Sequence, residues 1–134
     1  MKAIDVNCLL GAWPFRKIRK DKLEDLLEVH KKNDIEYGFV SSLSSVFYND
    51  PFEADEDLNE IIKDTNYRQI LTVNPELPGI KEDIIKAKED FGIIGVRIYP
   101  GYHNYFLGDS SMKELCKLLR ENDLPLFISL RMED

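Results

Sequence analysis

Five short apolar runs recur along the chain, and a stretch of helical periodicity follows each of the first four. The runs predict strands at Lys2–Val6, Tyr37–Ser41, Arg68–Val73, Ile93–Tyr99 and Pro125–Leu130. Most positions within these runs are apolar instead of alternating with polar ones. Strands of that kind are typical of a parallel sheet that is covered by helices.

Four helical patterns lie between the runs, with apolar positions at intervals of three and four residues. They predict helices at Lys22–Lys32, Asp55–Lys63, Ile80–Glu89 and Met112–Arg120. Asp21 and Glu24 have the spacing of a capping box before the first helix, and Ser111 and Glu114 repeat that spacing before the fourth. Because no linker or low-complexity segment interrupts the alternation, it predicts an α/β fold in one domain, residues 1–134.

Two parallel architectures fit this alternation, and the first is a five-stranded flavodoxin-like sheet. Its signalling version, the response-regulator receiver domain, needs a phosphorylatable aspartate after the third strand and a lysine after the fifth. Asn74 stands after the third strand and cannot take a phosphoryl group. The fifth strand runs into Ser129, Leu130 and Arg131 without a lysine. The receiver reading therefore fails.

The second architecture is a (β/α)8 barrel, also called a TIM barrel, of which this chain is a part. The predicted strands begin about 31 residues apart, and eight such repeats make about 250 residues, the typical size of this barrel. The chain would then hold four complete βα units and the fifth strand. We expect a (β/α) barrel-type parallel sheet that forms the N-terminal portion, β1–β5, of a TIM barrel.

Composition narrows the partners of such a domain. The 134 residues carry a formal net charge of −7, which argues against nucleic acid because few basic groups are present to neutralise phosphates. The longest basic cluster, Arg16–Lys20, is typical of a solvated face. No apolar run approaches the roughly 18 residues of a membrane span. These features predict a cytoplasmic protein with no nucleic acid and no membrane as partner.

The two cysteines, Cys8 and Cys116, lie far apart, and neither belongs to a CxxC motif. The sequence therefore contains no disulfide framework and no zinc signature. Cys116 shares a helical stripe with Met112, Leu115 and Leu119, which predicts a place in the core.

Four segments together resemble a known family. They are IDVNCLLG (4–11), LTVNPELPG (71–79), GIIGVRIYPGYHNY (92–105) and LPLFISL (124–130). In this order and spacing they are similar to the amidohydrolase-related (amidohydrolase 2) family of metal-dependent hydrolases, which includes aminocarboxymuconate-semialdehyde-type decarboxylases. The resemblance implies a barrel whose active site lies at the C-terminal ends of the strands. It also implies a divalent cation such as zinc, which activates a water or polarises a substrate carbonyl.

The metal ligands of that family are not kept in this sequence. Its two first-strand histidines fall on Asn7 and Leu9, and its fifth-strand histidine falls near Ser129. An amide oxygen is a poor zinc ligand, and leucine has no donor atom. The remaining histidines, His30 and His103, stand at no ligand position of the family. We therefore expect no metal and no cofactor.

Cys8 lies next to the first-strand ligand position but one residue out of phase with it. Side chains alternate along a strand, so Cys8 should point away from the barrel interior.

Alternation along the strands also supplies the candidate site. Asp5 and Asn7 should share one face of the first strand, and Gly95, Arg97 and Tyr99 should share one face of the fourth. The resemblance puts Arg97 at an inward position, where its planar guanidinium could clamp a carboxylate or phosphate. It could instead pair internally with Asp5 and fill the barrel.

The loop Pro100–Tyr105 and the residue Asn74 complete the rim of this site. His103 could act there as a general acid or base, or be an exposed loop histidine. Trp13 could close over a ligand or plug the top of the barrel. The candidate catalytic residues are Arg97 and His103, and the candidate substrate-binding residues are Asp5, Asn7, Trp13, Asn74 and Tyr99.

Three functions remain open from the sequence. The first is a hydrolase or lyase acting on a small carboxylate- or amide-bearing metabolite. The second is a non-catalytic barrel that binds a small anionic molecule. The third is a fragment with no function alone. If the chain ends at residue 134, the open edges of a five-stranded sheet predict a homo-oligomer.

Overall fold

A computed structural model describes residues 2–130 and contains one sheet of five parallel strands. The strands pair in sequence order, β1-β2-β3-β4-β5, so each strand lies beside the one before it. Their bounds are β1 Ala3–Leu10, β2 Ile35–Ser42, β3 Arg68–Thr72, β4 Gly95–Ile98 and β5 Leu126–Ile128. Each of the five overlaps a predicted strand, although β1 extends four residues beyond its predicted end at Val6 and β5 is shorter than predicted.

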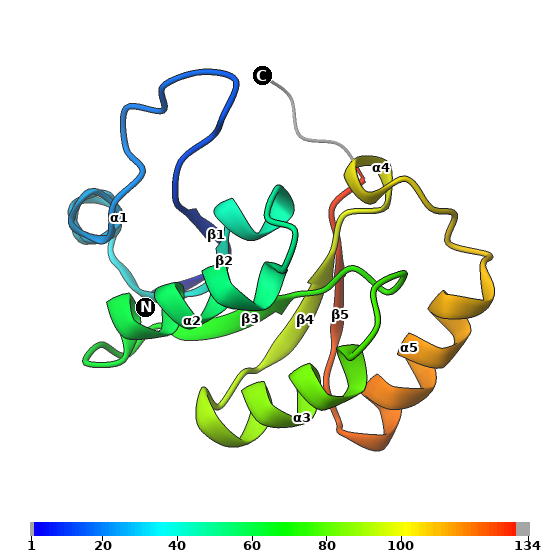
Figure 1. The fold of residues 1–134 in the computed structure, drawn as a ribbon. Coiled ribbons are helices and arrows are strands. Elements are labelled where there is room, and N and C mark those ends of the chain that lie inside the picture. Colours follow the sequence, from blue (N-terminus) through cyan, green and yellow to red (C-terminus); the bar gives the residue numbers. More distant parts are fainter. Residues whose placement is uncertain (1, 131–134) are drawn as a thin grey trace.

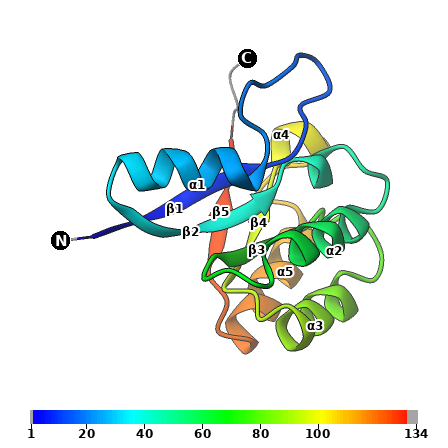
Figure 2. The ribbon, with the colours of Figure 1, turned by 90° about the vertical axis from the view of Figure 1, so that its left-hand side faces the viewer.

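The longer helices lie on one side of this sheet, and a short helix follows the fourth strand directly at that strand's end (Figures 1 and 2). Their bounds are α1 Leu23–Lys32, α2 Pro51–Ile62, α3 Ile80–Asp90, α4 Pro100–His103 and α5 Ser110–Glu121, and a 3₁₀ turn spans Ser44–Val46. The sheet curls so that α1, α2, α3 and α5 cover its convex face, and the first and last strands are its edges. This is a half-barrel, the architecture expected of the N-terminal portion of a TIM barrel.

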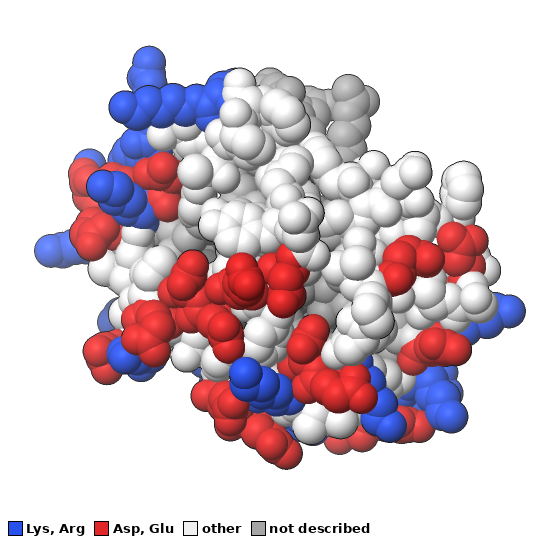
Figure 3. Space-filling model, viewed as in Figure 1, with Lys and Arg blue, Asp and Glu red and all other residues white. Residues whose placement is uncertain are grey.

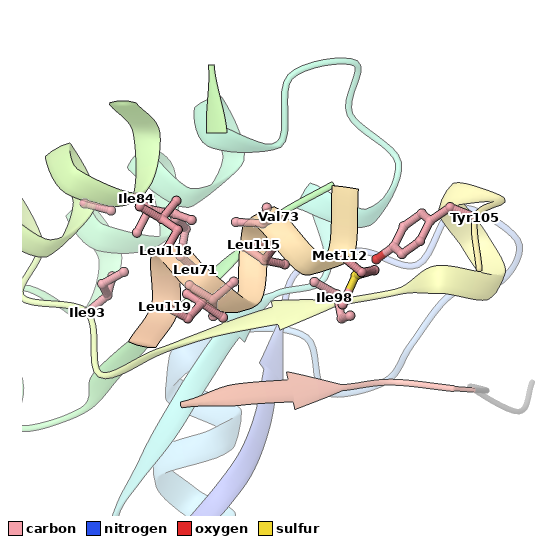
Figure 4. Close-up of a cluster of buried hydrophobic side chains, with 12 residues drawn as sticks. Leu71, Val73, Ile84, Ile93, Ile98, Tyr105, Met112, Leu115, Leu118 and Leu119 are labelled. Atoms are coloured by element: carbon pink, nitrogen blue, oxygen red, sulfur yellow. The ribbon is translucent and has the colours of Figure 1, made fainter. Parts of the chain in front are cut away.

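The main core lies between β3, β4 and the helices α3 and α5. Leu115, Leu118 and Leu119 of α5 belong to the same buried cluster as Leu71 of β3 and Ile98 of β4 (Figure 4). Because Val96 and Ile98 pack on this outer side, the residues between and after them, Arg97 and Tyr99, face the concave side. The core thus fixes which side chains point into the half-barrel.

A second cluster joins β1 and β2 to α1 and α2. Cys8, Leu10 and Val40 pack there with Leu58 and Ile62. The pairing of β1 with β2 is irregular, because the register shifts between Asp5 and Cys8. The expectation that Cys8 points away from the interior is confirmed.

The helix starts differ from the predicted ones. At α1 the first residue outside the helix is Lys22, whose N–H donates to Asp25, so the Asp21–Glu24 box is wrong by one residue. At α5 the corresponding residue is Asp109, whose carboxylate accepts from the N–H of Phe106. The Ser111–Glu114 box is also wrong, since the Ser111 hydroxyl donates to Glu76 instead.

Two further features of the helices differ from expectation. The segment Pro100–His103 forms the short helix α4 where a loop was expected. Cys116 is exposed on α5, so its predicted place in the core is wrong. Both of its helical neighbours toward the core, Leu115 and Leu119, are buried, and Cys116 lies just beyond that stripe.

Candidate functional site

Arg97 in the middle of the concave face is the centre of the candidate site. Its backbone belongs to β4, and its side chain reaches toward the carboxyl ends of the strands. Nε donates to the Ser41 hydroxyl of β2 at 2.9 Å, and Nη1 donates to the Ser129 hydroxyl after β5 at 3.1 Å. The guanidinium also lies 5.5 Å from the ring centre of Phe127. Arg97 therefore bridges strands on both sides of its own.

The guanidinium of Arg97 is buried without a neutralising carboxylate in the described part of the chain. The residue is 5% exposed, its printed partners are hydroxyls, and it takes part in no ion pair among residues 2–130. Within that range its Nη2 atom is buried without a hydrogen-bond partner. Burial lowers the pKa of Arg97 from its usual value. A buried cation in this situation gains strongly from an anionic acceptor.

Tyr99 lies two residues further on the same face and is fully buried. Its hydroxyl lies beside Thr72, and burial raises the pKa of Tyr99 to about 12, although the positive charge of Arg97 acts in the opposite direction. The phenol is therefore neutral in the physiological range and can donate a hydrogen bond.

His103 on α4 is half-buried and packs against Tyr99 with a ring-centre distance of 6.1 Å. Its Nε2 lies 2.8 Å from the Val46 carbonyl oxygen, which can only accept, so Nε2 carries the hydrogen. Its Nδ1 is buried with no partner among residues 2–130. Burial lowers the pKa of His103, while the bond to Val46 raises it. The ring is thus a neutral imidazole with a free lone pair on Nδ1.

An aromatic cluster covers this end of the half-barrel. The Trp13 ring makes edge contacts with Phe15, Phe47 and Tyr102 at 5.1–5.9 Å, and Tyr102 contacts Tyr99 in turn. This packing favours the interpretation that Trp13 plugs the top of the barrel.

Asp5 lies elsewhere, and its predicted position is wrong. Its carboxylate contacts His30 on α1 at 3.2 Å, on the convex side of the sheet. The register shift between Asp5 and Cys8 is the physical reason, because it breaks the alternation that put Asp5 and Asn7 on one face. Asp5 is therefore not the internal partner of Arg97.

Asn7 and Leu9 stand on β1 where the family resemblance puts metal ligands. The Asn7 backbone N–H donates to Asp5, and Leu9 packs with the apolar residues below the aromatic cluster. Ser129, the third such position, already accepts from Arg97. One amide, one hydrocarbon side chain and one hydroxyl do not fit a divalent metal.

Asn74 lies at the end of β3, where its side-chain oxygen accepts the N–H of Glu76 and so shapes the loop toward α3. It lines a groove of about 440 Å³ beside α2 and α3, and a second groove of about 570 Å³ lies beside α1 and α2. Arg97 lines neither groove. Among residues 2–130, the Asn74 side chain makes no hydrogen bond to Arg97, Tyr99 or His103.

Sequence reasoning missed two parts of this region. The hydrophobic pattern marks Ser41 only as the end of a strand, although its alternation with Val40 indicates the inward face. The pattern predicts Asp55 as the start of a helix, but the residue is fully buried and accepts hydrogen bonds from Thr72 and Gln69. Its spacing to Leu58 and Ile62 on the buried stripe was the available signal.

The loop between β1 and α1 carries the densest positive charge near this end of the strands. Arg16, Lys17, Arg19 and Lys20 are all exposed there. Figure 3 shows basic side chains at the upper left, where this loop lies in Figure 1, whereas acidic side chains dominate the face below. Although the chain has a net charge of −7, the positive charge of this loop would attract anions to this end of the strands.

Comparisons with known proteins agree with the half-barrel. No protein-family model and no curated protein sequence matches the chain. A 5-carboxyvanillate decarboxylase from Novosphingobium aromaticivorans, solved with manganese and 3-methoxy-4-hydroxy-5-nitrobenzoic acid, matches with a TM-score of 0.63 and 18% identity. That match covers 77% of this chain and 33% of the decarboxylase.

A second solved structure gives the same result. A probable 2-pyrone-4,6-dicarboxylic acid hydrolase from Acinetobacter baumannii, with citric acid bound, matches with a TM-score of 0.61 and 12% identity. The match covers 96% of this chain and 49% of the hydrolase.

These likenesses define the class of fold. The chain has the fold of the first five strands of a TIM barrel, and it spans between a third and a half of the length of these two structures. Among the described helices, none combines the length and apolar character needed to cross a membrane.

Proposed function

We propose that this chain is the carboxylate-recognising part of an amidohydrolase-related barrel, a hydrolase or lyase whose substrate is a small carboxylate-bearing metabolite. The observation that carries the proposal is the buried Arg97 guanidinium, whose Nη2 has no acceptor among residues 2–130. A substrate carboxylate would supply that acceptor in a charge-assisted hydrogen bond.

Two further observations support this assignment. The basic loop Arg16–Lys20 would attract an anion to the end of the strands where Arg97 lies. The two solved structures described above are named for carboxylated substrates, a carboxyvanillate and a pyrone dicarboxylic acid. We extend that substrate class, a small aromatic or pyrone carboxylate, to this chain.

The catalytic step would use His103. With its hydrogen on Nε2 and bound to Val46, the Nδ1 lone pair can accept a proton as a general base. Arg97 would hold the substrate carboxylate, and Tyr99 would donate a hydrogen bond. Because the donors at Asn7, Leu9 and Ser129 do not fit a divalent metal, we derive no step through one.

Ligand binding tests the proposal most directly. Isophthalate should raise the melting temperature of the full chain, whereas isophthalamide, which has the same shape without charge, should not. Arg97→Met should weaken isophthalate binding at least tenfold in calorimetry, the loss of about one charge-assisted hydrogen bond. Arg68→Met, which removes an exposed arginine from β3, is the matched control and should bind like the parent.

Unchanged binding in Arg97→Met would contradict the proposal. If that variant does not fold, Arg97→Lys keeps the charge but loses the planar fork, and it should bind isophthalate more weakly than the parent. Equal affinity of the lysine variant and the parent would count against recognition by the fork.

The second candidate is a carboxylate-binding barrel without turnover, and the unsuitable metal donors favour it. His103→Gln separates the two candidates. For an enzyme, this variant should bind isophthalate normally and lose turnover of aromatic carboxylates, followed by product chromatography. Since the pKa of His103 is lowered, the parent rate should fall only below about pH 6.5.

A further inference from the structure

A cluster of three potential metal donors lies between β1 and α1, outside the carboxylate site. The Asp5 carboxylate oxygen lies 3.2 Å from His30 Nε2, and Cys8 Sγ lies 3.9 Å from the same nitrogen. One donor atom from each residue lies within 4.8 Å of the other two. A carboxylate oxygen, a sulfur and an imidazole nitrogen are the three ligand types that zinc uses in proteins.

The irregular pairing of β1 creates this cluster. In a regular strand Asp5 and Cys8, three residues apart, would point to opposite faces. The register shift between them turns both side chains to the convex side, against α1. Bulges of this kind commonly re-aim side chains at functional sites. The local backbone therefore brings together two donors that alternation would separate.

Gly38 on the neighbouring strand leaves the space that the cluster occupies. A Cβ atom at this position would lie 2.4 Å from Cys8 Sγ and 3.3 Å from the His30 ring. Gly38 does not have a positive φ, so its backbone does not require glycine. The absent side chain serves the packing of Cys8 and His30.

Tyr67 orients the imidazole of His30. The Tyr67 hydroxyl lies 2.6 Å from His30 Nδ1, and the two rings stack with a 6° angle between their planes. When Nδ1 donates its hydrogen to this hydroxyl, Nε2 presents a lone pair to Asp5 and Cys8. An outer partner on the second ring nitrogen is the usual companion of a metal-binding histidine.

We propose that Asp5, Cys8 and His30 bind one zinc ion between β1 and α1. Tetrahedral zinc holds nitrogen and oxygen ligands about 3.3 Å apart and nitrogen and sulfur ligands about 3.6 Å apart, close to the separations found here. The His30 side chain is 3% exposed and that of Asp5 is 34% exposed, so a fourth, water-bound position would lie on the Asp5 side.

This site departs from the expectation of a chain without metal. That expectation rested on the family's ligand positions at the concave face, and the new donors lie on the convex face. Bound zinc would tie the first strand to the first helix. The competing interpretation is a metal-free hydrogen-bond network in which His30 Nε2 donates to Asp5 and Nδ1 accepts from Tyr67.

Cobalt substitution distinguishes the two interpretations. The full chain, treated with a chelator and dialysed, is titrated with Co²⁺, which occupies zinc sites and absorbs in the near ultraviolet when a thiolate binds it. We expect a thiolate-to-cobalt band that saturates at one ion per chain and disappears on adding Zn²⁺. Cys8→Ser should abolish the band, and Asp5→Asn should weaken Co²⁺ binding at least tenfold.

Two matched variants serve as controls. Cys116→Ser removes the exposed cysteine, and His103→Gln removes the other histidine; both should keep the full band. If Cys8→Ser does not fold by circular dichroism, Asp5→Asn carries the test, because its side chain is partly exposed. A parent that shows no saturable band, or a band that survives Cys8→Ser, overturns the proposal. Arg97→Met should keep the band, so failure of the carboxylate site leaves this test intact.

Discussion

Asp55 is a carboxyl group placed fully out of contact with water. One of its oxygens accepts the Thr72 N–H at 3.1 Å and lies 3.2 Å from the Ser45 hydroxyl oxygen. That hydroxyl also lies 3.1 Å from the Pro51 carbonyl, and its single hydrogen cannot serve both. A protonated Asp55 resolves the conflict, because it donates to Ser45 while Ser45 donates to Pro51. Burial correspondingly raises the pKa of Asp55 well above its usual range.

The pH dependence of stability should reveal this proton. Asp55 ionises near pH 3.8 in the unfolded chain and at a higher pH in the folded one, so folding takes up a proton between these values. Its contribution to stability is full below pH 3.8 and is lost as pH rises toward the folded pKa. Urea unfolding at pH 5 and pH 8 should therefore show a lower free energy at pH 8.

Two variants assign that slope to Asp55. Asp57→Asn, on the exposed side of the same helix, should keep the parent's slope. Asp55→Asn should flatten the pH dependence of the free energy of unfolding. It should also lower that free energy at pH 5 by about 1–3 kcal/mol, because one amide N–H of the asparagine would face another hydrogen-bond donor instead of an acceptor. An equal slope in Asp55→Asn and the parent would exclude a proton on this residue.

Side-chain facing could be predicted for β4 but not for β1. Arg97 and Tyr99 follow the period of two, and their inward position follows from Val96 and Ile98 packing outward. The same rule predicts that Asp5 and Asn7 share one face of β1, but a register shift turns the Asp5 side chain to the opposite face. Such a shift leaves no mark in the hydrophobic pattern, because it depends on the pairing of β1 with β2. The partners of Arg97 were missed for a related reason, since they come from two other strands.

At the scale of elements, the start of α2 is fixed by one side chain. Asp50 precedes the helix, and its carboxylate accepts the Phe52 N–H at 3.0 Å, while Pro51 occupies the first turn. Asp50→Ala should lower the free energy of unfolding by about 1 kcal/mol, measured by urea denaturation. Asp57→Ala, which removes an exposed carboxylate from the body of α2, should change it by less. Equal losses in both variants would contradict a capping role.

Strands were predicted more reliably than helix ends. A buried strand needs a run of apolar residues, and five such runs can be recognised in this sequence. Helix ends depend on which of several acidic residues reaches a free N–H, and the first helix uses Asp25 where Glu24 was expected. The short helix α4 was missed because four residues show no helical period.

Over residues 2–130 the molecule has one sheet, whose edge strands β1 and β5 each pair with a strand on one side only. Ile4 and Val6 on β1 are 43% and 53% exposed, and Ile128 at the opposite edge is 44% exposed. Exposed apolar edges favour pairing with another chain. We therefore expect residues 1–134 to self-associate, with a weight-average mass in sedimentation that rises with protein concentration.

A lysine on the edge should weaken this association. Val6→Lys should shift the sedimentation profile toward the monomer, since a charge at an edge strand opposes pairing. Ile61→Lys, which changes an exposed apolar residue of α2, is the matched control and should associate like the parent. A parent that stays monomeric at all concentrations would contradict the expectation.

The architecture could be predicted because the strands repeat at one interval, and a parallel barrel has that interval. Whether the sheet is open or closed could not be predicted from that interval, because closure depends on how the strands tilt and pair. The half-barrel and the two similar solved structures agree with an architecture of four βα units and a fifth strand.

The strand order has a consequence for synthesis. Each strand pairs with the strand made just before it, so no pairing waits for a distant segment. A nascent chain can add one strand and its helix at a time to a growing sheet as it leaves the ribosome, and the closing entropy of each step stays small.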